Sequence, residues 1–233
     1  MTWSWRIPSE RALLAPSLLS ADFGCLGEEI AAVEAAGADL LHLDVMDGQF
    51  VPSITMGPVV VEGVRRLTRL FLDAHLMVAE GARMAPAFRA AGCDGITIHA
   101  EACRDLPASL KAVRDTGARV GLSLNPDTPL ERIAAHLGEI DLLLLMTVFP
   151  GRSGQAFRPE VVPKIARASE LRAARGLGFA IEVDGGIAPE TAGRVRRAGA
   201  DILVAGSAVF GKPPYADRLA SLRQAADGRL GAP

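Results

Sequence analysis

The sequence predicts a single-domain α/β protein, a (β/α)8 TIM barrel in which eight parallel strands each lead into a helix. Three observations support this fold class. Short apolar runs alternate with stretches of helical periodicity along the whole chain, which is the pattern of repeated βα units and a parallel sheet. Eight such units fit within 233 residues, a usual length for a closed barrel. One short turn also recurs between helix and strand.

Each unit contributes one strand and one helix. The predicted strands are Ala12 to Pro16, Asp39 to Asp44, Leu70 to His75, Gly95 to His99, Val120 to Leu124, Leu142 to Val148, Ala180 to Asp184 and Ile202 to Ala205. The predicted amphipathic helices are Leu26 to Ala36, Val59 to Leu67, Ala82 to Ala91, Leu106 to Thr116, Leu130 to Leu137, Glu160 to Arg175, Thr191 to Ala198 and Ala216 to Ala226.

The recurring turn follows the helix ends and has the pattern Ala-Gly-x-Asp. Its copies are Ala36 to Asp39, Ala91 to Asp94 and Ala198 to Asp201. A glycine after a helix end takes the left-handed conformation that closes the helix, so the chain turns directly into the next strand. The alternative is an open doubly wound sheet, which normally has a G-x-G-x-x-G turn after its first strand. Here that turn, Ser17 to Asp22, contains no glycine.

The composition is typical of a globular protein that binds small molecules. Apolar residues make up 49% of the chain, charged residues 22%, and the net charge is −2. This balance argues against a nucleic-acid-binding surface and against an acidic disordered tail. The three cysteines show no C-x-x-C spacing, so we expect free thiols rather than disulfides or a thiolate zinc site.

Neither a signal peptide nor a membrane-spanning segment is predicted. Polar residues such as Arg6 and Glu10 interrupt the start of the chain, and no later apolar run has the length of a membrane helix. We therefore expect a cytoplasmic protein without membrane partners. Residues 1–10 are interpreted as an N-terminal extension and residues 11–233 as the catalytic barrel domain.

Four ionisable residues stand at predicted carboxyl ends of strands, where barrels place their chemistry. His42 and Asp44 share one face of the second strand, His75 ends the third and Asp184 ends the seventh. Two imidazoles and two carboxylates suit zinc, iron, manganese or cobalt better than calcium. Taken singly, each also fits an ordinary hydrogen-bonded strand end. His136, by contrast, lies in a helical pattern and is expected to be structural or solvent-facing.

Three loops rich in small residues predict a phosphate site. Gly185-Gly186 and Gly206-Ser207 follow the seventh and eighth strands, where backbone N–H groups of barrels usually bind phosphate. Residues 147–155, here named loop 6, follow the sixth strand and are rich in glycine, as an anion-covering lid would be. Arg152 in loop 6 suits a two-pronged grip on phosphate. Tight turns and a plain surface loop are the alternatives.

Three methionines fall at or just past predicted strand ends: Met46, Met77 and Met146. Core packing is the ordinary role of methionine, but a thioether is also a polarizable neighbour for a delocalised anion. We interpret the three as candidates for lining the pocket beside the metal.

These stretches together resemble the ribulose-phosphate 3-epimerase family. The resemblance extends from Ala15 to Phe210. Its segments are Ala15 to Asp22, His42 to Gly48 with Phe50 to Pro52, Asp73 to Val78, Leu124 to Pro126 with Thr128 to Pro129, Glu182 to Ile187, and Ala205 to Ala208.

The resemblance implies a metal-dependent epimerase of the pentose phosphate pathway. It would interconvert D-ribulose 5-phosphate and D-xylulose 5-phosphate by proton transfer at C3, through an enediolate. One divalent metal ion is implied at His42, Asp44, His75 and Asp184, with Asp44 and Asp184 also serving as the acid/base pair. The implied substrate contacts are Ser17, His75, Gly151, Arg152, Ser153, Gly154, Gly185, Gly186, Gly206 and Ser207. The family resemblance also leads us to expect a homo-oligomer.

Loop 6 departs from the family pattern Val-Asn-Pro-Gly-Phe-Gly-Gly-Gln. Phe149 replaces the asparagine, Arg152 the phenylalanine and Ser153 a glycine. Another ketose phosphate, such as allulose 6-phosphate or a tetrulose phosphate, is therefore an alternative substrate. A barrel that binds sugar phosphate without catalysis is a second alternative.

A third alternative, a Schiff-base aldolase, needs an amine at a strand end. The only lysines, Lys111, Lys164 and Lys212, lie in two predicted helices and after the last strand, which argues against this chemistry.

Overall fold

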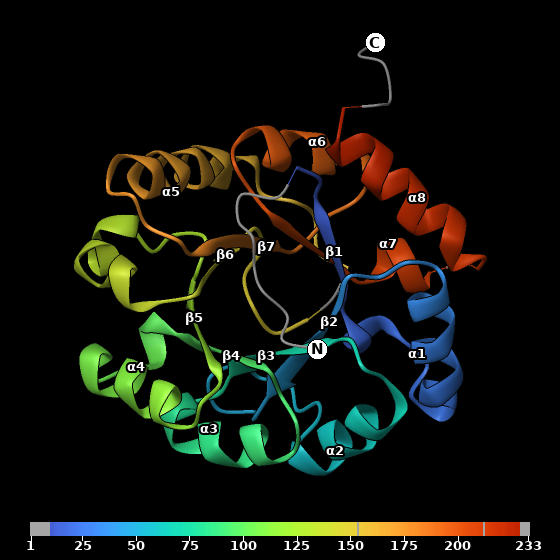
Figure 1. The fold of residues 1–233 in the computed structure, drawn as a ribbon, viewed down its shortest axis with the longest axis horizontal. Helices are drawn as coiled ribbons and strands as arrows, with labels where there is room; N and C mark the ends of the chain where they lie inside the picture. The colour runs from blue at the N-terminus through green and yellow to red at the C-terminus, as the bar shows by residue number, and fades with distance from the viewer. Residues whose placement is uncertain (1–9, 153, 212, 229–233) are drawn as a thin grey trace.

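The computed structural model describes residues 10–228 except 153 and 212, and these residues form a barrel. Eight parallel strands follow the order β1-β8-β7-β6-β5-β4-β3-β2. A parallel bridge between Ser17 and His42 brings the chain after β1 against β2 and completes the ring. Figure 1 shows the strands at the centre and the helices around them. The predicted single-domain (β/α)8 barrel is confirmed; most of the predicted N-terminal extension, and Ser153, lie outside the described residues.

The strands and helices alternate along the chain. The strands are β1 (Leu13–Pro16), β2 (Leu40–Met46), β3 (Phe71–Met77), β4 (Gly95–His99), β5 (Arg119–Leu124), β6 (Leu142–Met146), β7 (Ala180–Asp184) and β8 (Ile202–Ala205). The α-helices are α1 (Leu26–Ala35), α2 (Pro58–Leu67), α3 (Gly81–Ala90), α4 (Leu106–Asp115), α5 (Val162–Ala174), α6 (Pro189–Arg197), α7 (Ser207–Phe210) and α8 (Tyr215–Ala226). The 3-10 helices are η1 (Leu18–Ser20), η2 (Phe23–Cys25), η3 (Ala100–Ala102), η4 (Leu130–Glu139) and η5 (Pro159–Val161).

Several elements differ from expectation, among them β6, which ends at Met146 rather than at Val148. The amphipathic helix expected over Leu130 to Leu137 is the 3-10 helix η4. Strands β2 and β3 run two residues past their predicted ends, because their ladder continues to the pair Met46 and Met77. Polar side chains were expected to mark the strand ends, but Asp44 and His75 are paired neighbours inside the ladder. Both side chains therefore lie below the rim of the barrel.

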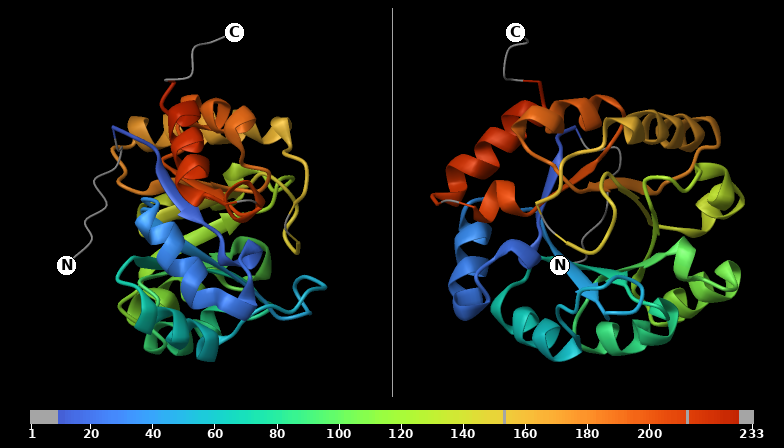
Figure 2. Two further views of the ribbon diagram at one scale, coloured as in Figure 1. Left: turned by 90° about the vertical axis from the view of Figure 1, so that its right-hand side faces the viewer. Right: turned by 180° about the vertical axis from the view of Figure 1, so that it is seen from behind.

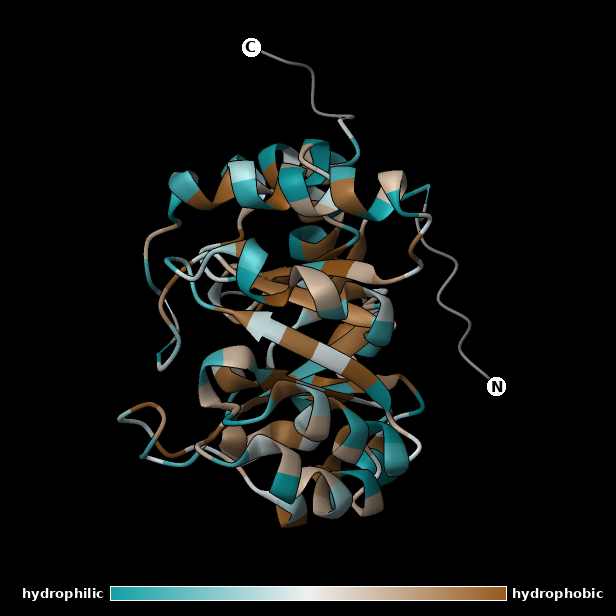
Figure 3. Cartoon of the chain, turned by 90° about the vertical axis from the view of Figure 1, so that its left-hand side faces the viewer, coloured by the Kyte–Doolittle hydropathy of each residue, from teal (hydrophilic) through white to brown (hydrophobic). Residues whose placement is uncertain are grey.

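Alternation along each strand separates two apolar layers. On β2, Leu41, Leu43 and Val45 face the helices as part of the large outer core. Leu40 points the other way and packs with apolar residues of β1, β3, β6, β7 and β8. In Figure 3 the strands are mostly hydrophobic, and hydrophilic residues concentrate on the surrounding helices. Over the described part of the chain, no helix combines the length and apolar character needed to cross a membrane.

The repeated Ala-Gly-x-Asp turn ties neighbouring strands together. Its glycines have positive φ angles: Gly37 (91°), Gly92 (110°) and Gly199 (109°). Each aspartate accepts a hydrogen bond from a backbone N–H of the preceding strand: Asp39 from Leu14 (2.9 Å), Asp94 from Leu72 (3.0 Å) and Asp201 from Ile181 (2.9 Å). The turn thus closes a helix and also fixes the level at which the next strand starts. Because these strands start at a fixed level relative to their neighbours, their carboxyl ends lie at the same rim of the barrel.

Candidate active site

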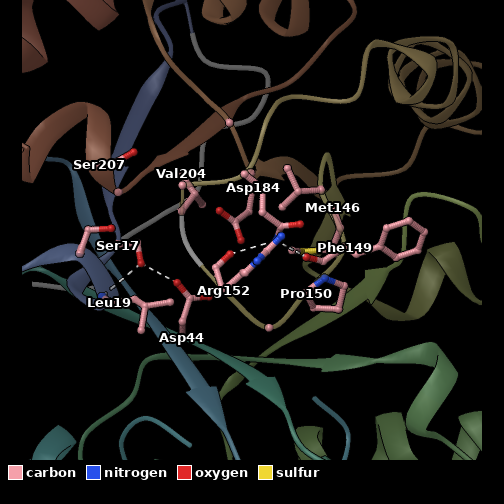
Figure 4. Close-up of a pocket in the computed structure, with 18 of the residues that line it drawn as sticks. Ser17, Leu19, Asp44, Met146, Phe149, Pro150, Arg152, Asp184, Val204 and Ser207 are labelled. Atoms are coloured by element: carbon pink, nitrogen blue, oxygen red, sulfur yellow. Dashed lines mark hydrogen bonds between the residues drawn. The ribbon is translucent and has the colours of Figure 1, made fainter. Parts of the chain in front are cut away.

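A pocket opens at the carboxyl end of the barrel, where the loops after β2 and β6 project together (Figure 2). Figure 4 shows Asp44 and Asp184 in this pocket, with Ser17 beside Asp44. The pocket is lined by Ser17, Leu19, Ser20, Asp44, Met46, Met77, Met146, Val148, Phe149, Pro150, Gly151, Arg152, Gly154, Gln155, Asp184, Gly185, Gly186, Ile187, Val204, Gly206 and Ser207. Apart from His42, His75 and Ser153, every predicted site residue is therefore at the pocket wall.

The four predicted metal ligands form one cluster, of which Asp44 and Asp184 line the pocket while His42 and His75 are buried. His42, Asp44, His75 and Asp184 each offer a nitrogen or oxygen atom, and these atoms lie within 4.8 Å of one another. Asp44 Oδ1 is 3.4 Å from His42 Nε2 and 3.1 Å from His75 Nδ1. Neither imidazole is exposed to solvent. His42 and Asp44 lie two residues apart on β2, and the fold brings His75 of β3 and Asp184 of β7 to them.

The free nitrogen of His42 fits a metal ligand. His42 Nδ1 lies 2.8 Å from Asp73 Oδ2, so the proton of a neutral ring belongs on Nδ1. Nε2 then carries a lone pair, and it is buried without a hydrogen-bond partner among the described residues. An imidazole held by a carboxylate on one nitrogen, with the other aimed at carboxylates, is the usual arrangement around protein-bound transition metals. The residues present therefore fit a divalent metal ion.

The two pocket carboxylates have opposite pKa shifts. Burial acts to raise the pKa of Asp44, but the charge of His42 and the close contacts with both histidines outweigh it and hold the pKa far below its usual value. Burial raises the pKa of Asp184 to about 7, and the negative charge of Asp44 adds to this increase. Two carboxyl groups whose environments separate their pKa values are suited to different roles in proton transfer.

The two histidines also differ. Burial lowers the pKa of His75 to about 4, and the contact with Asp44 opposes only part of the shift, so the ring is neutral near pH 7. Burial also acts to lower the pKa of His42, but the charge of Asp44 and the close contacts with Asp44, Asp73 and Glu182 raise it well above its usual value. The raised pKa reflects an excess of negative charge around His42. The same excess attracts a metal cation.

The small residues of the loops after β7 and β8 border the pocket beside loop 6. Gly185 and Gly186 have φ angles of 116° and 65°, which favour glycine. Thr147 Oγ1 donates to the backbone carbonyls of Asp184 (2.8 Å) and Gly185 (2.5 Å), and so ties loop 6 to the loop after β7. Within loop 6, Gln155 Nε2 donates to the carbonyl oxygens of Phe149 (2.7 Å) and Arg152 (3.0 Å). Figure 4 shows Arg152 at the pocket.

Sequence reasoning gave no role to three buried polar residues around the cluster. Asp73 contacts His42, His99 contacts His75, and Glu182 lies 3.5 Å from His42 Nδ1. Burial raises the pKa of Glu182 to about 8, with the charge of Asp73 adding to the shift. Asp73 and Glu182 each precede a predicted ligand by two residues on the same strand, and this spacing places them on the same face. This two-residue spacing is the sequence signal from which the positions of Asp73 and Glu182 beside the cluster could have been predicted.

His136 lies apart from the pocket, in η4. Its Nδ1 is 2.8 Å from Glu139 Oε1 on the same helix, and the side chain is partly exposed. The expectation of a structural or solvent-facing residue agrees with this placement. The three cysteines are free thiols, as expected. Lys111 and Lys164 lie in α4 and α5, as predicted, and Lys212 lies outside the described residues.

The family model described as the ribulose-phosphate 3 epimerase family matches residues 13–210 of the chain. The chain belongs to this family. It is therefore an enzyme of the epimerase class, and the resemblance noted in the sequence is confirmed. The matched residues span all eight strands, including those that carry the His–Asp cluster.

Relatives from several bacteria are similar over nearly their whole length. Ribulose-phosphate 3-epimerase of Synechocystis is 48% identical over 92% of this chain and 94% of its own length. The Bacillus subtilis protein of the same name is 48% identical over 90% and 97%, and the Escherichia coli K12 protein is 42% identical over 87% and 91%.

Two solved structures support the fold alone. KGPDC from Streptococcus mutans has a TM-score of 0.67 at 17% identity, covering 95% of this chain and 100% of that one. Orotidine 5'-phosphate decarboxylase from Pyrococcus horikoshii has a TM-score of 0.67 at 15% identity, covering 93% and 100%. At such low identity the shared feature is the barrel, so function has to be argued from the pocket.

Proposed function

We propose that this epimerase interconverts D-ribulose 5-phosphate and D-xylulose 5-phosphate by proton transfer at C3, with one bound divalent metal ion. The observation that supports the proposal most is the cluster of His42, Asp44, His75 and Asp184, whose two carboxylates line a pocket that glycine-containing loops also border. The family supplies the class of reaction, and the cluster supplies groups suited to it.

The proposed metal ligands are His42, Asp44, His75 and Asp184. Their nitrogen and oxygen atoms suit zinc, iron, manganese or cobalt. When bound, the ion supplies Lewis-acid stabilisation of the negative charge that develops on the substrate oxygens next to C3. This chemistry matches the difficulty of the reaction, because a proton beside a ketone is too weakly acidic for an unaided carboxylate.

Asp44 and Asp184 are the proposed acid/base pair. Asp44 removes the C3 proton of D-ribulose 5-phosphate from one face, Asp184 returns a proton to the other, and the reverse reaction exchanges these roles. Inversion requires two groups because the two faces differ. The hydroxyl of Ser17, a proposed substrate contact, donates to Asp44 Oδ2 at 2.5 Å and holds the carboxylate in orientation.

The phosphate is proposed to lie against the backbone of loop 6 and of the loops after β7 and β8. These loops combine small residues with the short helix α7, which begins at Ser207. The proposed contacts are Gly151, Arg152, Ser153, Gly154, Gly185, Gly186, Gly206 and Ser207, of which Ser153 lies outside the described residues. Met46, Met77 and Met146 form the apolar side of the same pocket.

The proposal is tested with a panel of ketose phosphates of four, five and six carbons. Exchange of the C3 proton with deuterated solvent is followed by NMR, and bound metal is quantified in the same preparation. We expect the highest kcat/KM with D-ribulose 5-phosphate and about one metal ion per chain. A higher kcat/KM with a four- or six-carbon substrate would favour one of the alternative substrates. Those alternatives are considered because loop 6 departs from the family pattern at Phe149 and Arg152. Binding without exchange would identify a non-catalytic barrel.

Gly186→Ala is expected to raise KM for the ketose phosphate by about tenfold, or about 1.4 kcal/mol of binding. The φ angle is 65°, and an added Cβ would lie 2.6 Å from the backbone nitrogen of Phe157. The loop after β7 would then have to move away from Phe157, which follows loop 6 in the chain. Gly176→Ala is the matched control, because its φ angle is 60° but nothing lies within 4 Å of the added Cβ. Equal KM values for the two variants, measured by steady-state kinetics, would argue against this phosphate position.

A further inference from the structure

A hydrogen-bonded chain leads from His75 away from the pocket. His75 Nε2 lies 2.8 Å from His99 Nε2, and His99 Nδ1 lies 3.3 Å from Glu101 Oε2. The two imidazole rings stack with their centroids 4.9 Å apart. Neither histidine is exposed to solvent. Because water does not reach these rings, their protein partners determine which nitrogen of each ring carries the proton.

The far end of this chain is a fixed acceptor. Glu101 Oε1 accepts hydrogen bonds from the backbone N–H of Asn125 (2.8 Å) and from Thr128 Oγ1 (2.5 Å), which leaves Oε2 for His99. Burial acts to raise the pKa of Glu101, but the hydrogen bonds from His99, Thr128 and Asn125 outweigh it and lower the pKa to about 2. An ionised carboxylate only accepts hydrogen bonds, so His99 must donate from Nδ1.

The remaining protons follow in order. A neutral His99 that is protonated on Nδ1 has a lone pair on Nε2, which faces His75 Nε2. His75 must therefore donate from Nε2, and its own lone pair lies on Nδ1. That nitrogen is the one 3.1 Å from Asp44 Oδ1, inside the His–Asp cluster.

Proton counting along this chain leads to the same assignment. The three contacts between Asp44, His75, His99 and Glu101 would need three protons as hydrogen bonds, whereas two neutral imidazoles carry two. A cation held by His75 Nδ1 and Asp44 removes the need for the third proton. With both imidazoles neutral, all contacts of this chain are therefore satisfied when a cation lies between His75 Nδ1 and Asp44.

We propose that His99 and Glu101 are positioning residues that set the tautomer of His75, so that its Nδ1 lone pair is free to bind the metal. We name this pair the His99–Glu101 relay. The inference rests on the proposed function, because it presupposes His75 as a metal ligand. The relay gives His75 what Asp73 gives His42 directly: a carboxylate that orients the ring and selects the ligating nitrogen.

Glu101→Gln is expected to reverse the direction of hydrogen-bond donation along the relay, while the side chain keeps almost the same shape. The hydrogen bonds from Asn125 and Thr128 hold the amide oxygen at the Oε1 position, so the amide NH2 faces His99 Nδ1. His99 then accepts at Nδ1 and donates from Nε2, in conflict with a metal-ligating His75. We expect zinc affinity, measured by chelator competition, to fall by about 10- to 100-fold. In ¹⁵N spectra of the zinc-loaded proteins, the ring proton of His99 is expected to move from Nδ1 to Nε2.

Three further variants complete the test. Asp127→Asn likewise removes one negative charge, from an exposed residue that acts on Lys164 as Glu101 does. This control variant is expected to leave zinc affinity unchanged. His99→Leu removes both polar contacts and is expected to lose affinity as Glu101→Gln does. His99→Gln keeps an acceptor for His75 and a donor for Glu101, and is expected to bind zinc nearly as the unaltered protein does.

The outcomes separate the relay from the metal site. If Glu101→Gln keeps both the zinc affinity and the His99 tautomer of the unaltered protein, the relay is overturned. If His75→Ala binds zinc as tightly as the unaltered protein, the proposed metal site is wrong and the relay loses its role with it. Loss of affinity in His75→Ala, His99→Leu and Glu101→Gln, with retention in Asp127→Asn and His99→Gln, supports both.

Discussion

Asp184→Asn is expected to lower kcat for epimerisation by a factor of about 10³, because it removes one of the two groups proposed to move protons at C3. The amide keeps the size of the side chain and an oxygen able to bind a metal, so the barrel is expected to remain folded. Asp44→Asn is expected to have a loss of similar size. Bound metal must be quantified in both variants, so that a lost proton-transfer group is distinguished from a lost metal ion.

The two variants are expected to differ in which epimer still exchanges its proton. Asp184→Asn retains Asp44, so it should exchange the C3 proton of D-ribulose 5-phosphate with solvent deuterium without forming xylulose 5-phosphate. Asp44→Asn should do the same with D-xylulose 5-phosphate. Both reactions are followed by NMR in deuterated buffer. Full epimerisation by either variant, or exchange of the opposite epimer, would contradict the assigned roles.

The fold was predictable from the sequence because the barrel repeats its signals. The alternation on β2, with Leu41 and Leu43 toward the helices and His42 and Asp44 toward the interior, can be read directly from residue order. The Ala-Gly-x-Asp turn marks where strands start. Strand ends were less predictable: β2 continues to Met46 because its partner β3 continues as well, and that pairing is a property of two segments rather than one.

The candidate site was predictable as a set of residues but not as a network. His42, Asp44, His75 and Asp184 were recognisable since each stands near a strand end beside small or apolar residues. Which nitrogen of each imidazole is free depends on Asp73 for one ring and on His99 for the other. These partners come from neighbouring strands, and only the register of β2, β3 and β4 places them against His42 and His75.

Arg172→Met is expected to lower the free energy of unfolding by about 3–5 kcal/mol, because it leaves a buried carboxylate without its main partner. Arg172 Nη1 contacts Asp201 Oδ2 and donates to the carbonyl oxygen of Phe179 at 3.0 Å. The side chain of Asp201 is 1% exposed, and its Oδ2 also accepts from the backbone of Ile181. The ion pair therefore links the start of β8 to the start of β7. Asp184 lies at the other end of β7.

The same turn supplies a matched control, because Asp39 occupies the equivalent position before β2. Arg11 binds Asp39 at 2.6 Å with half of its side chain exposed, and Arg223 also binds Asp39, at 2.9 Å. Arg11→Met is therefore expected to change stability by less than about 1 kcal/mol. Urea unfolding followed by circular dichroism measures both. Similar shifts in the two variants would mean that burial does not distinguish these ion pairs. A large loss confined to Arg172→Met would show that the buried ion pair before β8 stabilises the fold, whereas the more exposed Arg11–Asp39 pair contributes little.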